Sequence, residues 1–316
     1  MEKIYSLIKN FKPAHWLYNL LHYKSLAHNK QAFKQYNVYK PLFASISSKD
    51  FPDKKSSAWL DVDDSKIVAI DNPAFNSFSS AEKEQILNWS HNGFMLLPNF
   101  FNDDTCAQIN NEIDRITASK LIKLTHDNKL PFANRISPII KQVTYHEQLG
   151  KILNFILGKE VVPFQTLNFI KGSNQRAHSD SIHMTTYPLG YLIAVWIALE
   201  DTNENNGPLF YYPGSHKLPY LLNNDFNESS NILNLGKKDY SDYEDVIEEI
   251  VQTNRFEKKT FFAKKGDVFI WHANLIHGGA PIIDKALTRK SMVIHYYAKD
   301  VIKYHEISER PSLMET

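Results

Sequence analysis

The spacing of apolar residues changes along the chain, and this change divides the expected secondary structure. In the first half, apolar positions recur every three or four residues, which is the period of a helix with one buried face. The predicted helices cover residues 80–92, 103–119 and 147–157. Ser79 followed by Glu82 is a capping-box signature for the first of them, and Asp103 or Asp104 is expected to cap the second. A short apolar strand over 93–98 separates these two helices.

From about residue 160 the pattern becomes one of β-branched and aromatic runs, separated by turns rich in Gly, Asn and Pro. The predicted strands cover residues 164–170, 191–199, 209–212, 259–262, 268–272 and 292–298. An inserted amphipathic helix is expected over 243–254. Many short strands after a helical first half indicate an α+β protein with a mainly β core. That core is an antiparallel sandwich or barrel with helices packed outside.

The first 78 residues differ in composition from the rest. Residues 1–40 contain seven lysines and a single acidic residue, Glu2, and apolar residues recur at helical spacing before and after Pro13. Two interpretations follow. The favoured one is a helical hairpin packed on the main domain with a solvated basic face; the alternative is attachment to an anionic membrane surface. We expect an N-terminal helical and irregular extension over 1–78 and a main domain over 79–316, with its β core at about 160–298.

Composition limits the classes of function. With 43% hydrophobic and 22% charged residues, the 316-residue chain is typical of a globular protein, and a net charge of +1 gives no electrostatic case for nucleic acid. The only cysteine, Cys106, excludes an internal disulfide framework, which favours a reducing cytoplasm. We find neither a secretory signal nor the roughly 20 consecutive apolar residues of a membrane span. A soluble, cytoplasmic protein is expected.

A histidine and a carboxylate two residues apart, His178 and Asp180, follow the predicted 164–170 strand. In an extended segment such residues point to the same side, so both can reach one divalent metal. His277 is the best third ligand. Two histidines and one carboxylate leave positions open for a cosubstrate and O2, which is the ligand set of non-haem Fe(II) oxygenases. For the pair taken alone, a surface histidine and aspartate in a turn is the alternative.

Arg289 follows His277 by 12 residues, just before the predicted 292–298 strand. A turn between them would bring the two neighbouring strands side by side. An arginine at this place can hold the far carboxylate of a metal-bound oxo acid through two parallel hydrogen bonds, which a lysine cannot match.

Several motifs occur in an order that resembles the phytanoyl-CoA dioxygenase family. They are GSNQRAHSD at 172–180, WIALED at 196–201, NGPL at 206–209, YPGSHK at 212–217, GDVFIW at 266–271 and HGG at 277–279, with Arg289. The resemblance is strong over about 160–298, extends from about residue 85, and is absent from the first 75 residues.

The resemblance implies a double-stranded β-helix fold, Fe(II) as the metal, and 2-oxoglutarate and O2 as cosubstrates. It makes His178, Asp180 and His277 the iron ligands and Arg289 the clamp on the far carboxylate of 2-oxoglutarate. The implied reaction is hydroxylation of a C–H bond with release of succinate and CO2. Family halogenases have a small residue at the carboxylate position, so Asp180 favours hydroxylation.

Two further residues are assigned by the same resemblance. Trp196 stands where the family has an aromatic residue against 2-oxoglutarate, and Gln165 stands where relatives contact substrate or cosubstrate. Asn168 is the rival of Gln165, although strand alternation directs it to the opposite face. The substrate is open: a small molecule, or a lipid- or sugar-linked one. Other functions to weigh are an inert β-helix module that binds a glycan or lipid, and a peripheral membrane adaptor that uses the basic N-terminal segment.

Several residues near the motifs have a structural interpretation instead. His183, His272 and His295 lie near strands and are predicted to be hydrogen-bonded structural histidines. Trp271 is predicted to belong to the core. Arg176 either contacts an anionic substrate or forms a surface salt bridge.

Overall fold

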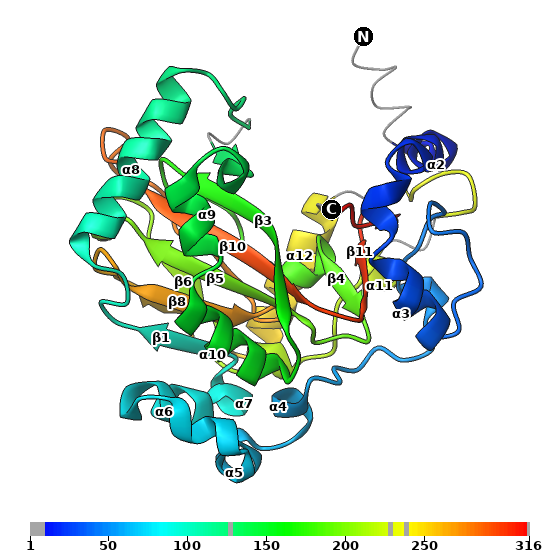
Figure 1. Cartoon of the computed structure of the whole chain (residues 1–316), viewed down its shortest axis with the longest axis horizontal. Coiled ribbons are helices and arrows are strands. Elements are labelled where there is room, and N and C mark those ends of the chain that lie inside the picture. Colours follow the sequence, from blue (N-terminus) through cyan, green and yellow to red (C-terminus); the bar gives the residue numbers. More distant parts are fainter. Residues whose placement is uncertain (1–9, 126–128, 227–229, 237–239, 315–316) are drawn as a thin grey trace.

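The molecule is built around two antiparallel sheets that share an interior (Figure 1). A computed structural model describes residues 10–125, 129–226, 230–236 and 240–314. The larger sheet has the strand order β1-β8-β5-β10-β3-β2, and the smaller one has the order β7-β6-β9. The strands of the larger sheet are β1 (Phe94–Leu97), β8 (Val268–His272), β5 (Leu192–Ala198), β10 (Ser291–Ala298), β3 (Val161–Phe169) and β2 (Lys129–Pro131). Those of the smaller sheet are β7 (Lys259–Phe261), β6 (Leu209–Tyr211) and β9 (His277–Gly279).

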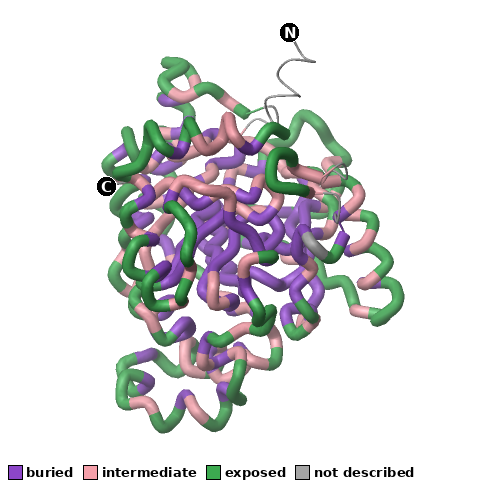
Figure 2. Tube along the Cα trace, turned by 90° about the vertical axis from the view of Figure 1, so that its right-hand side faces the viewer, coloured by how far each residue is buried: buried purple, intermediate pink, exposed green. Residues whose placement is uncertain are grey.

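Strand β5 shows how the sequence separates two cores. All seven of its residues are buried, because both faces of the larger sheet are covered. Ile193, Val195 and Ile197 belong to the apolar cluster that the outer helices cover, whereas Ala194 and Trp196 belong to the cluster shared with the smaller sheet. This period-two alternation places every second side chain inside the roll, where the site lies. Buried residues accordingly fill the middle of the chain trace in Figure 2.

Helices cover the outer face of the larger sheet. They are α6 (Ser80–Leu87), α7 (Trp89–Asn92), α8 (Asp103–Ala118), α9 (Pro138–Thr144) and α10 (Glu147–Leu157). The three predicted segments are helical, the first of them as the two helices α6 and α7, whereas α9 was not predicted. Ser79 and Glu82 form the expected capping box. The cap of α8 is different from the expectation: Asn102, and neither Asp103 nor Asp104, accepts a hydrogen bond from the Thr105 amide. The two aspartates lie in the first turn, where their negative charges interact favourably with the helix dipole.

The segment 41–78, predicted to be an irregular connection, contains two short helices, α4 (Trp59–Val62) and α5 (Ser65–Asp71). They pack against the main domain, and Trp59 donates an indole hydrogen bond to the Phe155 carbonyl of α10. Nε2 of His272 in β8 lies 2.9 Å from the carboxylate of Asp61 in α4, and both side chains are buried. This part of the chain is therefore joined to the strand that leads to His277.

A third sheet, which the sequence pattern did not reveal, pairs two C-terminal strands with a strand from the middle of the chain. It has the order β12-β11-β4, with β12 (Arg310–Pro311), β11 (Ile302–His305) and β4 (Thr185–Tyr187). Helices α2 (Lys12–Leu21) and α3 (Asn29–Gln35) lie beside it at one edge of the molecule (Figure 1). The helix predicted from Ile4, Leu7 and Ile8 lies outside the described residues.

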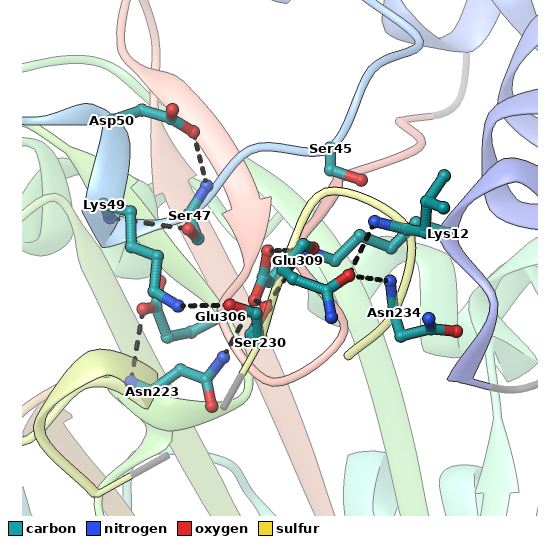
Figure 3. A network of polar contacts seen from close by, with 12 residues as sticks. Lys12, Ser45, Ser47, Lys49, Asp50, Asn223, Ser230, Asn234, Glu306 and Glu309 are labelled. Atoms are coloured by element: carbon teal, nitrogen blue, oxygen red, sulfur yellow. Dashed lines mark hydrogen bonds and ion pairs between the residues drawn. The ribbon is translucent and has the colours of Figure 1, made fainter. Parts of the chain in front are cut away.

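Buried polar residues fix the N-terminal segment to the C-terminal strands, as Figure 3 shows. Lys12 pairs with Glu309 at 2.6 Å, and both side chains are buried. Glu306 accepts hydrogen bonds from the amides of Ser48 and Asn223. Helices α11 (Asn223–Phe226) and α12 (Tyr240–Thr253), the latter near the predicted 243–254, complete the fold.

Candidate metal and cosubstrate site

His178 and His277 meet through their backbones. They form an isolated antiparallel bridge in which the amide of each donates to the carbonyl of the other at 2.9 Å. A side chain at the next residue, Gly278, would bring Cβ within 2.7 Å of the Gln175 carbonyl, so glycine permits this close approach of strand β9 and the 171–179 loop. Two ligands that are 99 positions apart in the sequence are thus held side by side by main-chain hydrogen bonds.

Asp180 lies at the start of a 3₁₀ turn (Asp180–Ile182) instead of in the extended segment that we predicted. Its Oδ1 atom is 4.0 Å from Nε2 of His178 and 3.9 Å from Nε2 of His277. Ligand atoms of all three residues lie within 4.8 Å of one another, and all three side chains are buried. The hydroxyl oxygen of Tyr243 on α12 lies 3.0 Å from both the amide nitrogen and the hydroxyl oxygen of the intervening Ser179.

The hydrogen bonds of the two imidazoles leave their Nε2 atoms available. Nδ1 of His178 lies 2.9 Å from the Arg176 carbonyl, and Nδ1 of His277 lies 3.0 Å from the Leu275 carbonyl. Because a carbonyl only accepts, each Nδ1 must carry the proton, and each Nε2 directs its lone pair towards Asp180. Burial, followed by the neighbouring His277, lowers the pKa of His178 to about 3. A neutral imidazole is the form that binds a metal.

The carboxylate of Asp180 is held from behind by Trp271, which we had predicted to be a core residue. The indole Nε1 donates to Oδ2 at 2.8 Å, which leaves Oδ1 facing the two histidines. His295 is also close, with Nε2 at 3.6 Å from Oδ2. Burial by itself would raise the pKa of Asp180, but His277 and His295 beside it bring the pKa below its ordinary value. The residue is therefore a carboxylate with one oxygen oriented for a ligand.

Arg289 is almost completely buried and lies just before β10. Its Nε has no hydrogen-bond partner among the described residues, and its guanidinium carbon lies over the rings of Phe169 and Trp196, 5.8 and 5.7 Å from their centroids. Burial lowers its pKa to about 10, so it stays charged at neutral pH. A buried cation without an anion is costly unless a ligand supplies the negative charge.

The two halves of the site share one cavity of about 300 Å³. Its lining includes the six residues that the sequence singled out: Gln165, His178, Asp180, Trp196, His277 and Arg289. Trp196 comes from β5, opposite Val293 of β10, and Gln165 comes from β3, opposite His295. Asn168 is fully buried and does not line the cavity, and both polar atoms of its amide lack a partner among the described residues.

Of the remaining residues, some match their structural interpretation and others do not. His272 is a hydrogen-bonded structural residue, because it pairs with Asp61 and accepts from the Asn274 amide. Arg176 forms surface ion pairs with Asp245 and Glu248 of α12.

The other two histidines differ from the prediction. His183 and His295 line the cavity, and Nδ1 of His295 has no partner among the described residues. Burial lowers the pKa of His183 to about 4. Lys129 and His305 also line the cavity, and no local motif marked either of them.

This donor set fits Fe(II) together with an oxo acid. Two neutral imidazoles and one carboxylate on one side of a cavity are suited to a non-haem iron, and the unpaired guanidinium is suited to a carboxylate. Fold and site together define the class, a double-stranded β-helix with a buried two-histidine, one-carboxylate centre.

Residues 89–290 match the profile of the family described as Phytanoyl-CoA dioxygenase (PhyH). The chain belongs to this family, as its motifs predicted, and is an Fe(II)- and 2-oxoglutarate-dependent dioxygenase. It is similar to the ectoine dioxygenase of Bordetella bronchiseptica, with 25% identity over 212 residues, covering 62% of this chain and 68% of that protein. It is also similar to the peroxisomal phytanoyl-CoA dioxygenase of Rattus norvegicus, with 23% identity over 251 residues, covering 71% and 70%.

Solved structures confirm the predicted fold. The carbocyclase SnoK from nogalamycin biosynthesis superposes with a TM-score of 0.57 at 13% identity, covering 77% of this chain and 95% of that one. EctD from S. alaskensis with 2-oxoglutarate and 5-hydroxyectoine superposes with a TM-score of 0.56 at 19% identity, covering 80% and 86%. In the described part of this chain, no helix has the length and apolar character needed to cross a bilayer.

Proposed function

We propose that the chain hydroxylates an unactivated C–H bond of a small-molecule substrate, with formation of succinate and CO2. His178, Asp180 and His277 hold the iron, Arg289 binds the far carboxylate of 2-oxoglutarate, and Trp196 and Gln165 shape the cosubstrate compartment. Iron with bound 2-oxoglutarate supplies the oxidising chemistry. The observation that carries the proposal is the unpaired, buried Arg289 guanidinium in the same cavity as the three potential ligands.

The chain's own residues perform three tasks in this reaction. The two carbonyl-bound imidazoles keep their Nε2 lone pairs on the iron side, and Trp271 keeps the Asp180 carboxylate from rotating. The rings of Phe169 and Trp196, which the guanidinium lies over, shield it from water and so strengthen its pairing with a carboxylate. The presence of Asp180 at the carboxylate position supports hydroxylation over halogenation.

The size and lining of the cavity bear on the substrate. About 300 Å³ must hold the cosubstrate as well, so only a small molecule, or the reacting end of a lipid- or sugar-linked one, fits inside. Gln175, His183 and His305 offer hydrogen bonds to it. We further propose residues 79–316 as the catalytic unit, 1–78 as its extension, and a cytoplasmic location, which the single buried cysteine supports.

The test is the variant His178→Ala, compared with the exposed His91→Ala as a control. We expect His178→Ala to abolish Fe(II) binding and succinate formation from 2-oxoglutarate while the circular dichroism spectrum is unchanged, because a site with one imidazole and one carboxylate binds iron weakly. The control should behave as the wild type. Undiminished succinate formation by folded His178→Ala would disprove the ligand assignment.

A further inference from the structure

Helix α2 packs on the protein through polar residues and exposes its leucines to solvent. Its buried residues are Lys12 and Asn19, which are polar. The residues Leu17, Leu20 and Leu21 share one face by their spacing, yet they are 61%, 49% and 75% exposed. An amphipathic helix that packs on a core normally buries its apolar face, so this apolar face is available to something outside the described chain.

The reversed orientation is fixed by strong contacts. Lys12 reaches the carboxylate of Glu309 and the carbonyl of Asn231, each at 2.6 Å (Figure 3). Asn19 donates to the Phe43 carbonyl at 3.0 Å. Turning the leucines inward would separate Lys12 from the buried Glu309, and breaking a buried ion pair is strongly destabilising. The helix is therefore held with its leucines outward.

A distant segment beside the start of α2 also exposes apolar side chains. Residues 231–235 run beside the start of α2, with an antiparallel bridge between Phe11 and Asn234 and a hydrogen bond from the Lys12 amide to the Leu233 carbonyl. Ile232 is 77% exposed there. We use the name α2 patch for the exposed residues Leu17, Leu20, Leu21, Tyr23, Ile232 and Leu233. Exposed apolar patches larger than those of ordinary monomer surfaces mark interaction sites.

Lysines predominate in the segment that carries α2. Residues 10–49 contain six lysines and no aspartate or glutamate, although Lys12 is paired with Glu309 and Lys40 with Asp50. Lys24 follows directly on Tyr23, and Lys30 and Lys34 lie on α3, and all three are exposed. An exposed apolar helix face with lysines and tyrosines near it has the composition of interfacial helices on anionic membranes.

We propose that the α2 patch docks the enzyme on an anionic lipid surface, with the leucine face of α2 inserted among the acyl chains and the lysines at the headgroups. This changes the interpretation that we favoured from sequence, in which the basic face was merely solvated. The proposal does not depend on the oxygenase chemistry. The same lysines disfavour a second copy of the chain as the occupant, since a twofold contact would bring like charges together.

The experiment is co-sedimentation of the full chain with phosphatidylcholine vesicles that do or do not contain phosphatidylserine. We expect binding to the anionic vesicles that weakens at high salt. The triple variant Leu17→Ser, Leu20→Ser, Leu21→Ser should lose binding by about tenfold or more, because the inserted apolar area is gone. Because these side chains are exposed, the variant should keep the wild-type circular dichroism spectrum and Tm.

The matched control is Ile67→Ser with Ile70→Ser on α5, two apolar residues that are 66% and 57% exposed on a different helix. This double variant should bind vesicles as the wild type does. Equal soluble fractions of wild type with and without anionic vesicles would overturn the proposal, as would undiminished binding of the triple variant. A wild-type dimer that the triple variant converts to a monomer in sedimentation velocity would instead identify a self-interface and also overturn it.

Discussion

Arg289 is a buried cation whose Nε has no partner among the described residues. In the proposed role, replacing it with leucine would remove two charge-assisted hydrogen bonds to the far carboxylate of 2-oxoglutarate, so we expect the KM for 2-oxoglutarate to rise roughly 10- to 100-fold. Arg289→Lys should recover only part of the loss, because a lysine cannot form the two-bond fork. Initial rates of succinate formation against 2-oxoglutarate concentration provide the measurement.

A second arginine offers the control for that variant. Arg176 is near the metal pair in sequence but forms ion pairs with Asp245 and Glu248 at the surface. Arg176→Leu should leave the KM for 2-oxoglutarate within about twofold of the wild type, since exposed ion pairs contribute little. If Arg289→Leu also left this KM unchanged, the clamp would have to be another residue.

Trp271 orients the carboxylate ligand without reaching the metal position. We expect Trp271→Phe to raise the Kd for Fe(II) about 10- to 100-fold, as loss of a partner behind a ligand does elsewhere, with a much smaller effect on the KM for 2-oxoglutarate. Iron titration followed by isothermal calorimetry measures the first quantity. Trp59→Phe is the control, because it also removes an indole hydrogen bond, to the Phe155 carbonyl, but far from the site. An iron affinity equal to that of the wild type would show that the Trp271 hydrogen bond is incidental.

At the scale of elements, α4 and β8 are joined by the buried pair of Asp61 and His272. Burial by itself would raise the pKa of Asp61. The adjacent His272 and the hydrogen bonds that Asp61 accepts keep this pKa below the ordinary value. Asp61→Ala should lower the free energy of unfolding by about 3 kcal/mol, because it leaves buried polar groups without their partner. Urea denaturation measures this change. The exposed Asp63→Ala, two residues away, should cost less than about 0.5 kcal/mol; equal effects of the two variants would contradict the expectation.

The elements also show what sequence patterns can and cannot predict. The proposed ligands His178 and Asp180 share one local motif, and His277 lies in a second motif almost 100 residues later, so all three could be selected as candidates without coordinates; the structure brings their ligand atoms within 4.8 Å of one another. The hydrogen bond from Trp271 to Asp180 joins residues 91 positions apart and leaves no local signature, so an aromatic residue in a buried strand was assigned to the core.

The shortest helices and strands were not predicted from the sequence for another reason. Helices α4 and α5 have four and seven residues, which is too short for a helical period to stand out. Strand β11, of four residues, pairs with the distant β4, and β12, of two residues, pairs with β11; both are too short for their composition to mark them. The α8 cap was misassigned by one residue because Asn102, Asp103 and Asp104 are all good capping residues.

For the whole molecule, the polar network between the chain ends predicts a dependence of stability on pH. Burial raises the pKa of Glu306 from its ordinary 4.5 to about 7, although Ser48 and Asn223 donate hydrogen bonds to it. The folded state therefore binds the proton more tightly than the unfolded state. This contribution to stability is fully present below about pH 4.5 and is lost as the pH rises through about 7.

We expect the free energy of unfolding of Glu306→Gln, relative to the wild type, to increase by roughly 2–3 kcal/mol between pH 5 and pH 8. The variant keeps the neutral form at every pH, whereas wild-type Glu306 must ionise inside the protein. Buried histidines titrate in the opposite direction, but they are common to both proteins and cancel in the difference. Denaturant unfolding at the two pH values measures it. Glu160→Gln, at an exposed ion pair with Lys299, should show no such change, and a difference that is flat with pH would remove Glu306 as its source.

The backbone bridge between His178 and His277 couples two properties that are usually considered apart. The same pair of main-chain hydrogen bonds closes one end of the roll and brings the imidazoles together. Parting of the 171–179 loop from β9 would therefore also separate the two imidazoles, so local opening at this seam would dismantle the proposed iron site.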